Sequence, residues 1–326
     1  MHILLTGAFG NIGFSTLQAL LEQGHVVRCF DQRVKTTEKK AQRVQNSAEL
    51  VWGDIRDVGA VTEAVKGQEV IIHLAYIIPP AVDEQPALAY EVNVRGTRHV
   101  IEAAKAQQQP PKILFGSSLD VFGHTQDKEP PRRVSDPVQA TDAYSQQKIT
   151  CEEMVKDSGL EWAIYRFADV PPLEARPMHP IMYSIPLSTR FEMIHTHDVG
   201  LAIANGIHSP IWEKTWLIGG GASCQVRYRD YLYRALEGVG LKPPPDEAFA
   251  PDSKPYCTDW LDTTESQELL HYQRHSFDDI MRDVLAATRP AGVAAWLLPL
   301  LRPLIRRRML RLSPYLKNHA GSIQAT

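Results

Sequence analysis

Short apolar runs alternate with segments of helical spacing along the first half of the chain. Short apolar runs between turn residues are typical of buried strands. These runs occupy residues 3–6, 26–30, 48–52, 69–74, 112–115 and 161–166. Apolar residues three or four positions apart predict helices over residues 14–23, 58–66, 91–107 and 143–158, and a polar segment over 36–45 predicts a loop with a surface helix.

This alternation predicts an α/β fold, because βαβ units build parallel sheets and right-handed crossovers make such sheets doubly wound. We therefore expect a Rossmann-type doubly wound parallel sheet with a small C-terminal substrate lobe. The predicted sheet domain covers residues 1–170, and the lobe covers 171–289, beginning in a proline-rich segment. Weaker patterns predict a strand over 191–195, a helix over 198–208 and a strand over 215–218, all returning to the sheet domain.

Residues 290–326 form a tail of a different character. The tail contains six Lys and Arg residues and no Asp or Glu, so it carries +6, and the rest of the chain carries −3 − 6 = −9. Its apolar and basic residues are interleaved over 291–312, as in helices that lie at a membrane surface, although Pro299 and Pro303 are expected to interrupt a helix. Docking on the body or a second subunit, peripheral membrane contact and a mobile tail all stay open.

Composition excludes several classes of protein. With 44% hydrophobic and 22% charged residues, the chain reads as a globular protein. A net charge of 35 − 38 = −3 argues against a general nucleic-acid binder. Four scattered cysteines without a CxxC pair, and no histidines at metal-ligand spacing, favour free thiols in a reducing compartment and predict no metal. With no leader and no apolar stretch of about 20 residues, we expect a cytoplasmic protein, membrane-associated only through the tail.

A glycine turn follows the first predicted strand directly. Gly7, Gly10 and Gly13 allow, in order, a tight reversal, close approach of a pyrophosphate, and packing of the next helix on the strand. The N–H groups at the helix N-terminus then face the anion. The sequence therefore predicts a dinucleotide cradle; its expected binding residues are Gly7, Phe9, Gly10, Asn11, Ile12 and Gly13.

Carboxylates after the second and third strands suit the adenosine part of such a cofactor. Asp31 lies 18 residues beyond Gly13, where a carboxylate accepts hydrogen bonds from ribose hydroxyls and repels a 2′-phosphate. NAD is therefore favoured over NADP, although Arg33 could bind a 2′-phosphate. Asp54 and Ile55 follow the third strand and are expected near the adenine; Asp54 could equally cap the next helix.

Tyr144 and Lys148 are spaced i, i+4 on one predicted helix face. A lysine beside a tyrosine hydroxyl favours the phenolate and is expected to lower the tyrosine pKa toward working pH. Ser118 follows the fifth predicted strand, at the sheet edge where ligands bind in such folds. The three residues predict a proton-transfer site at Tyr144.

Together these segments resemble the extended short-chain dehydrogenase/reductase family, the NAD-dependent epimerase/dehydratase group, over about residues 1–285. The matching segments are residues 6–13, 53–57, 73–75, 93–97, 117–123, 144–148 and 194–199. The resemblance implies catalytic roles for Ser118, Tyr144 and Lys148. It implies further cofactor contacts by Leu74, Ala75, Tyr76, Asn93, Lys148, Tyr144 and Val170, and a homodimer through two helices; Asn93 could instead satisfy only its own helix.

The chain departs from the sugar-nucleotide epimerases of this family at two positions. The family's Asn after the sixth strand is Asp169, which would repel a diphosphate, and its Arg before the late strand is replaced by Phe191, with Arg190 one place off register. The family's dehydratases carry Thr-Asp-Glu where this chain has Ser118-Leu119-Asp120. A nucleotide-diphospho-sugar substrate and dehydration are therefore both disfavoured.

We thus expect an NAD-dependent oxidoreductase that transfers a hydride between nicotinamide and a small molecule with a secondary hydroxyl or keto group. A sugar epimerase with tightly bound NAD would use the same residues. A non-catalytic NAD-binding scaffold or sensor is the alternative from another class.

Overall fold

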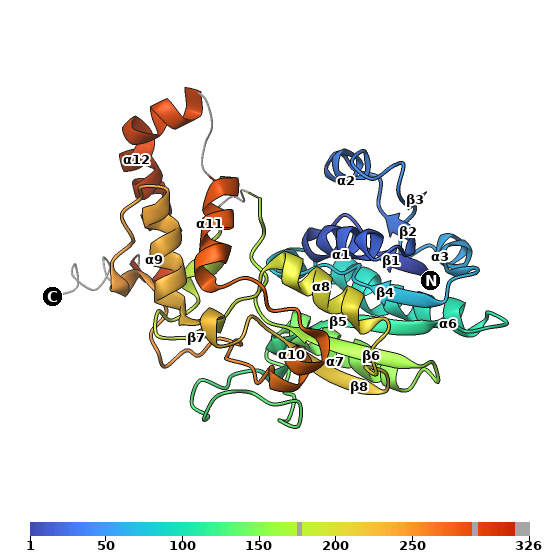
Figure 1. Ribbon diagram of the computed structural model, residues 1–326. Coiled ribbons are helices and arrows are strands. Elements are labelled where there is room, and N and C mark those ends of the chain that lie inside the picture. Colours follow the sequence, from blue (N-terminus) through green and yellow to red (C-terminus); the bar gives the residue numbers. More distant parts are fainter. Residues whose placement is uncertain (175–177, 289–292, 317–326) are drawn as a thin grey trace.

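The computed structural model describes residues 1–174, 178–288 and 293–316 (Figure 1). Its centre is a parallel sheet of seven strands in the order β3-β2-β1-β4-β5-β6-β8. The strands are β1 (His2–Thr6), β2 (Val26–Asp31), β3 (Glu49–Trp52), β4 (Val70–His73), β5 (Lys112–Ser118), β6 (Trp162–Phe167) and β8 (Lys214–Ile218). The predicted Rossmann-type doubly wound sheet is confirmed.

Helices cover both faces of this sheet because successive strand residues point to opposite sides. Ile3 and Leu5 of β1 face one apolar cluster, and Leu4 between them faces the other. The first face is covered by α1 (Asn11–Glu22) and α8 (Thr196–Gly206), and the second by α3 (Val58–Val65), α6 (Gly96–Lys105) and α7 (Ala143–Lys156). The polar segment forms α2 (Lys35–Ala41), as expected.

Three predicted boundaries near the carboxyl edge of the sheet are wrong. Helix α1 begins at Asn11, three residues early, because Gly10 in extended conformation already serves as its N-cap. Strand β5 continues through Ser118 instead of ending before it. The long helix predicted from residue 91 is preceded by α4 (Ala81–Glu84) and α5 (Pro86–Tyr90) and enters α6 through a π-helical turn, Glu91–Arg95.

Beyond β6 the chain returns to the sheet only in part. α8 packs tightly on α1, where a Cβ at Gly200 would lie 2.6 Å from the Ser15 carbonyl carbon, and β8 pairs with β6. The strand predicted over 191–195 forms instead as β7 (Arg190–Glu192), which pairs antiparallel with β9 (Gln225–Arg227) outside the main sheet. Further along, Leu261 forms a single parallel bridge with Arg132.

The lobe has an apolar cluster of its own. The remaining helices of the described chain are α9 (Tyr228–Gly238), α10 (Thr264–Leu270), α11 (Phe277–Thr288) and α12 (Val293–Leu312), and short 3₁₀ turns lie at Leu119–Phe122, Pro180–Tyr183, Ala222–Cys224 and Asp246–Ala248. Side chains from the 180s, α9, α11 and α12 meet in this cluster, among them Tyr183, Leu232, Ile280 and Met309.

The tail forms a helix through both of its prolines, contrary to the expected interruption. Met309 is fully buried in the lobe cluster and Ile305 packs beside it, so inner-face packing offsets the hydrogen bonds that Pro299 and Pro303 remove. Residues 289–292 and 317–326, and the side chains of 293–299, lie outside the described part, so the first part of the apolar and basic stretch predicted over 291–312 stays untested. Within the described part, no helix is long and apolar enough to cross a bilayer.

Candidate active site

Two adjoining hollows run along the carboxyl ends of the central strands. Their volumes are about 490 and 540 Å³, within the range of small-molecule and cofactor sites. Both are lined by a shared set of residues: Gly7, Gly10, Asn11, Leu74 and Tyr76. The hollows therefore form one trough with two ends, called here the cofactor end, beside Asp31, and the reacting end, beside Tyr144.

The glycine turn at the middle of the trough has no room for side chains. Gly7 adopts φ +67°, and a Cβ on it would lie 2.8 Å from the Ala75 nitrogen. A Cβ on Gly13 would overlap the Gly7 carbonyl. No side chain caps the N-terminus of α1, so its first N–H groups remain open to a ligand. Open amides and a cradle that a Cβ would fill fit a pyrophosphate.

The carboxylate predicted to bind ribose stands at the cofactor end. Asp31 Oδ2 accepts a hydrogen bond from the Phe9 N–H at 2.8 Å, and Oδ1 accepts one from the Gln32 N–H at 2.8 Å. Burial raises the pKa of Asp31, opposed by these two hydrogen bonds. Each oxygen has a further lone pair for a hydroxyl donor. Ile55 and Ala75 line the same end.

Three residues predicted to contact the cofactor do not line the trough. Arg33 is exposed and pairs with Glu38 at 2.7 Å. The Asp54 carboxylate pairs with the Arg56 guanidinium, with Nη2 2.5 Å from Oδ2. The buried Asn93 amide instead bonds the Ile77 backbone, accepting from its N–H at 2.7 Å and donating to its carbonyl at 2.9 Å. Asn93 thus fixes the chain segment that carries Tyr76.

The cationic groups at the cofactor end belong to Lys40 and Arg56, which sequence reasoning did not select. Lys40 Nζ pairs with Glu174 at 2.8 Å. Lys40 lies in the last turn of α2, within the polar stretch that the sequence marks only as a surface helix. Both cations therefore already have carboxylate partners on the protein.

A buried hydrogen-bonded chain supports the trough floor. His73 Nδ1 lies 2.7 Å from the Thr6 hydroxyl, and its Nε2 lies 3.0 Å from the Thr97 hydroxyl. Burial lowers the pKa of His73 to about 3, so the ring is neutral and links β1, β4 and α6.

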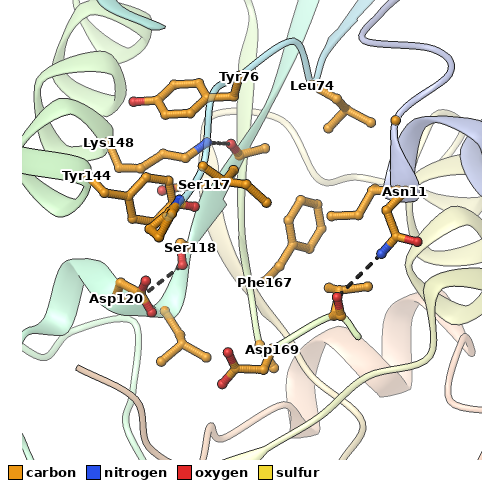
Figure 2. A pocket seen from close by; sticks show the side chains of 18 of the residues that line it. Asn11, Leu74, Tyr76, Ser117, Ser118, Asp120, Tyr144, Lys148, Phe167 and Asp169 are labelled. Carbon is orange, nitrogen blue, oxygen red and sulfur yellow. Dashed lines mark hydrogen bonds between the residues drawn. The ribbon is translucent and has the colours of Figure 1, made fainter. Parts of the chain in front are cut away.

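Ser118, Tyr144 and Lys148 converge at the reacting end (Figure 2). Capping of α7 by Asp142, whose Oδ1 accepts from the Ser145 N–H at 2.7 Å, fixes the first turn that carries Tyr144. One turn later, Lys148 Nζ donates to the Gly116 carbonyl at 2.6 Å and stands 3.4 Å from the Tyr76 ring centroid. The predicted spacing thus brings the three residues of β5 and α7 together.

The sequence predicts that Lys148 lowers the pKa of Tyr144, but in the structure this pKa is raised. Burial and the Asp120 charge raise the pKa of Tyr144, opposed by a hydrogen bond with Ser118. Burial lowers the pKa of Lys148 to about 7. Burial of Tyr144, the two carboxylates near it and the turn of Lys148 toward Gly116 account for the reversal, because each of them works against a phenolate at Tyr144.

Asp120 and Asp169, which follow β5 and β6, face the reacting end (Figure 2). Asp169 Oδ2 accepts a hydrogen bond from the Thr258 hydroxyl at 2.8 Å, and burial raises the pKa of Asp169 to about 6. Burial and the neighbouring Asp169 charge raise the pKa of Asp120 as well. The pair therefore resists carrying two negative charges.

A buried ion pair lies behind Ser118. Ser117 turns away from Ser118 and donates its hydroxyl to Glu152 Oε1 at 2.6 Å. Arg166 donates two hydrogen bonds to the same Glu152, from Nε to Oε1 at 2.9 Å and from Nη2 to Oε2 at 2.7 Å. The ion pair and the Ser117 bond lower the pKa of Glu152 despite its burial. This network ties α7 to β5 and β6 and so fixes Tyr144 relative to Ser118.

The lobe contributes residues that the sequence did not point to. Ile181 and Tyr256 line the reacting end, from segments whose local sequence shows no motif. Arg190, one place from the family's sugar-nucleotide arginine, is buried against Asp259, with Nε 2.6 Å from Oδ1. Its Nη2 also donates to the Thr125 carbonyl at 2.8 Å. Arg190 is thus held by the protein and does not line the trough.

Three histidines far apart in sequence meet beside the N-terminus of α8. Ligand atoms of His195, His197 and His275 lie within 4.8 Å of one another, a grouping that sequence spacing could not reveal. The His195 and His275 rings stack, with centroids 4.1 Å apart and planes at 16°. Parallel rings do not direct their lone pairs at one point, and His195 Nδ1 already accepts from the His197 N–H at 3.2 Å. His275 Nδ1 lies 2.6 Å from Asp198 Oδ1.

The chain is similar to known proteins of one family. The sequence profile of the "NAD dependent epimerase/dehydratase family" matches residues 3–170. The photosystem II assembly factor Ycf39 of Cyanophora paradoxa is 31% identical over 166 residues, 51% of this chain and 44% of that protein. UDP-glucose 4-epimerase 2 of Arabidopsis thaliana is 30% identical over 189 residues, 54% of this chain and 53% of that protein.

The chain thus spans about half the length of these curated relatives. Among solved structures, UDP-glucuronic acid 4-epimerase from Bacillus cereus, in complex with UDP-glucuronic acid and NAD, superposes with a TM-score of 0.71. Its sequence is 20% identical, and the match covers 88% of this chain and 98% of that one. At this identity the likeness shows the fold alone.

Proposed function

The chain belongs to the NAD-dependent epimerase/dehydratase family, and we propose that it is an oxidoreductase that moves a hydride between nicotinamide and a secondary alcohol or ketone. The observation that carries this proposal is the convergence of Ser118, Tyr144 and Lys148 at one end of a trough whose middle is a glycine cradle. Proteins that only bind NAD do not need a tyrosine and a serine hydroxyl at the reacting end.

In the proposed reaction, Ser118 holds the substrate oxygen and Tyr144 takes its proton. The O–H and carbinol C–H bonds break, the C–H electron pair leaves as a hydride, and a C=O bond forms. In the reverse direction, Tyr144 returns the proton to the new alkoxide oxygen. General acid–base transfer by a positioned side chain contributes a factor of about 100 to 10,000.

The trough residues fit NAD at both of its ends. Asp31 would hold the adenosine ribose, the Gly7–Gly13 turn the pyrophosphate, and Lys148 the nicotinamide ribose through the N–H bonds not given to Gly116. When bound, NAD supplies the hydride acceptor and, in its oxidised form, a positive charge. Such a charge near Tyr144 would oppose the two carboxylates and favour the phenolate.

The proposed substrate is uncharged or cationic near its reacting carbon. Asp120 and Asp169 line the reacting end, and Lys148, the cation beside them, already bonds Gly116. An anionic group such as a diphosphate would be repelled here. Arg190, which stands one place from the family's sugar-nucleotide arginine, is held by Asp259 and does not offset that charge. UDP-sugars, as bound by the B. cereus epimerase, are therefore disfavoured for this chain.

A sugar epimerase with retained NAD is the second proposal, favoured by the same residues and by the fold shared with the B. cereus enzyme. A non-catalytic NAD-binding scaffold or sensor is the third, suggested by the assembly-factor relative. The intact Ser118, Tyr144 and Lys148 set argues against the third proposal.

A cofactor-reduction screen separates these proposals. The purified protein is mixed with NAD and with secondary alcohols sorted by charge: neutral sugars and sterols, amino alcohols, hydroxy acids and UDP-sugars. We expect net NADH at 340 nm with a neutral or cationic alcohol. Interconversion of epimers without net NADH would favour the epimerase. NAD binding without turnover of any alcohol or ketone would favour the scaffold, and turnover of UDP-sugars alone would overturn the proposed substrate class.

A further inference from the structure

We propose that α12 binds the protein to the surface of an anionic lipid bilayer, through an outward face that carries leucines at one end and arginines at the other. Figure 1 shows α12 at the end of the molecule opposite β2 and β3, beside α9 and α11. The proposal is independent of the proposed catalytic function and concerns where the protein resides.

One face of α12 is already used by the lobe. Met309 is fully buried, Ile305 packs beside it, and the Tyr183 hydroxyl donates to the Met309 carbonyl at 2.8 Å. Just beyond the helix, the buried Ser313 hydroxyl donates to the Ala248 carbonyl at 2.6 Å. These contacts fix the rotation of the helix and so determine which residues it presents outward.

The opposite face presents large apolar side chains to solvent. Leu300 is 71% exposed and Leu304 64%, one turn apart on the same stripe. Exposed leucines that neighbour one another in this way are typical of a surface that binds something apolar. The stripe continues along the helix into Arg307 and Arg311, which are also exposed.

The arginines of α12 have no acidic partners. Three exposed arginines elsewhere in the lobe are paired: Arg229 with Asp246, Arg234 with Asp278, and Arg282 with Asp279. In the part of the chain that the structure describes, no carboxylate lies within ion-pair distance of the α12 arginines, Arg302, Arg306, Arg307, Arg308 and Arg311. The sequence from residue 290 onward contains no Asp or Glu, so this charge is available to an anionic surface.

A groove between α12 and the end of α9 concentrates the same charge. Its walls carry four basic side chains, and its volume is about 500 Å³; the lining residues are Gly240, Leu241, Lys242, Arg302, Pro303, Arg306, Arg307 and Leu310. The Arg306 Nε is buried and has no hydrogen-bond partner. A buried donor without an acceptor is costly, and a lipid phosphate oxygen is an acceptor that matches it.

A bilayer fits these features better than a second copy of the chain. A helix with apolar and basic residues on its outward face lies in the interfacial plane, with leucines among the acyl chains and arginines at the headgroups. The acidic body, at −9, could attract the arginines of another copy, but attraction between charges alone would leave the leucines in water. A dimer formed through α12 is therefore an outcome of the test.

The test is co-sedimentation of the full chain with vesicles of phosphatidylcholine alone and with about one third phosphatidylglycerol. We expect binding to the anionic vesicles only, and its loss in about 1 M NaCl, where charge is screened over about 3 Å. Each arginine near an anionic surface contributes a factor of roughly five to binding. The double variant R307Q/R311Q should therefore bind about 25-fold more weakly, and L300S/L304S should also release the protein.

The matched control is R234Q/R282Q, which removes two exposed arginines of the same lobe and should bind like the wild type. Circular dichroism and NAD affinity of every variant check that the fold is retained. Equal binding to both kinds of vesicle, or wild-type binding by R307Q/R311Q, would overturn the proposal. So would a lipid-free dimer, seen by analytical ultracentrifugation, that R307Q/R311Q dissociates.

Discussion

The two ends of the trough differ in how far they follow the family pattern. At the cofactor end, Asp31 and the glycine turn stand where the sequence predicted, and their contacts fit a dinucleotide. At the reacting end, the predicted Ser118, Tyr144 and Lys148 meet two carboxylates, Asp120 and Asp169. The cofactor would thus be held in the family's way, while the substrate meets an electrostatic environment that differs from a diphosphate-binding site.

This difference teaches that carboxylates at the two ends of a single trough can have opposite effects. Asp31 accepts two backbone N–H bonds and is placed to accept hydroxyls. Asp120 and Asp169 instead raise the pKa of Tyr144, the group proposed to transfer the proton. Substitutions at the two ends should therefore have different effects: on affinity at the cofactor end, and on chemistry and its pH dependence at the reacting end.

The largest effect is expected for Tyr144→Phe at the reacting end. Loss of the hydroxyl should lower kcat by a factor of about 100 to 10,000, while NAD affinity, measured by calorimetry, stays within about twofold. Tyr233→Phe is the matched control, because its hydroxyl bonds Asp246 on the lobe surface, and it should leave both quantities unchanged. Comparable loss of NAD binding in Tyr144→Phe would mean that the two ends are not separable.

Asp31→Asn should act on the cofactor end alone. Hydrogen bonds to a charged group contribute about 1.5–3 kcal/mol, so NAD affinity should fall by a factor of about 10 to 100, whereas NADP affinity should hold or rise. Asp230→Asn is the control, since Asp230 is exposed on the lobe, away from the trough, and its carboxylate accepts a hydrogen bond from the Arg227 N–H. Calorimetric titration with both cofactors measures the effect, and an unchanged ratio of NAD to NADP affinity would contradict the role of Asp31.

The smallest effect is expected for Asp169→Asn, as a shift in the pH profile. The Asp169 charge raises the pKa of Tyr144, so its removal should lower that pKa. Alcohol oxidation requires the phenolate form of Tyr144. The rising limb of its kcat–pH profile should therefore move to lower pH, by less than about one unit. The exposed Asp127 provides the control variant Asp127→Asn. The measurement is kcat as a function of pH. A rising limb that stays in place or moves to higher pH would contradict the proposed effect of the Asp169 charge on the pKa of Tyr144.

Local patterns were sufficient to predict the sheet and much of the trough. The glycine turn, Asp31 and the Tyr144–Lys148 pair each lie within one βαβ unit or one helix, so sequence spacing determines their geometry. Asp120 and Asp169 could have been found by the same rule, because both directly follow strands whose carboxyl ends face the ligand.

The remaining features depend on contacts between distant segments. Ile181 and Tyr256 reach the trough from the lobe, and His275 stacks on His195 across 80 residues. The pKa of Tyr144 was predicted wrongly for a similar reason, because helix spacing shows Lys148 but not the charges that β5 and β6 bring in. The rotation of α12 likewise follows from Met309 packing into the lobe.

The most direct test of hydride transfer is the absorbance at 340 nm during the first turnover. The protein saturated with NAD is mixed, in a stopped-flow instrument, with the alcohol that the screen identifies. The account predicts a rise in absorbance as fast as or faster than kcat, for a dehydrogenase and an epimerase alike, and its loss in Tyr144→Phe with NAD still bound. Product formation with no rise in absorbance, or an unchanged rise in Tyr144→Phe, would contradict it.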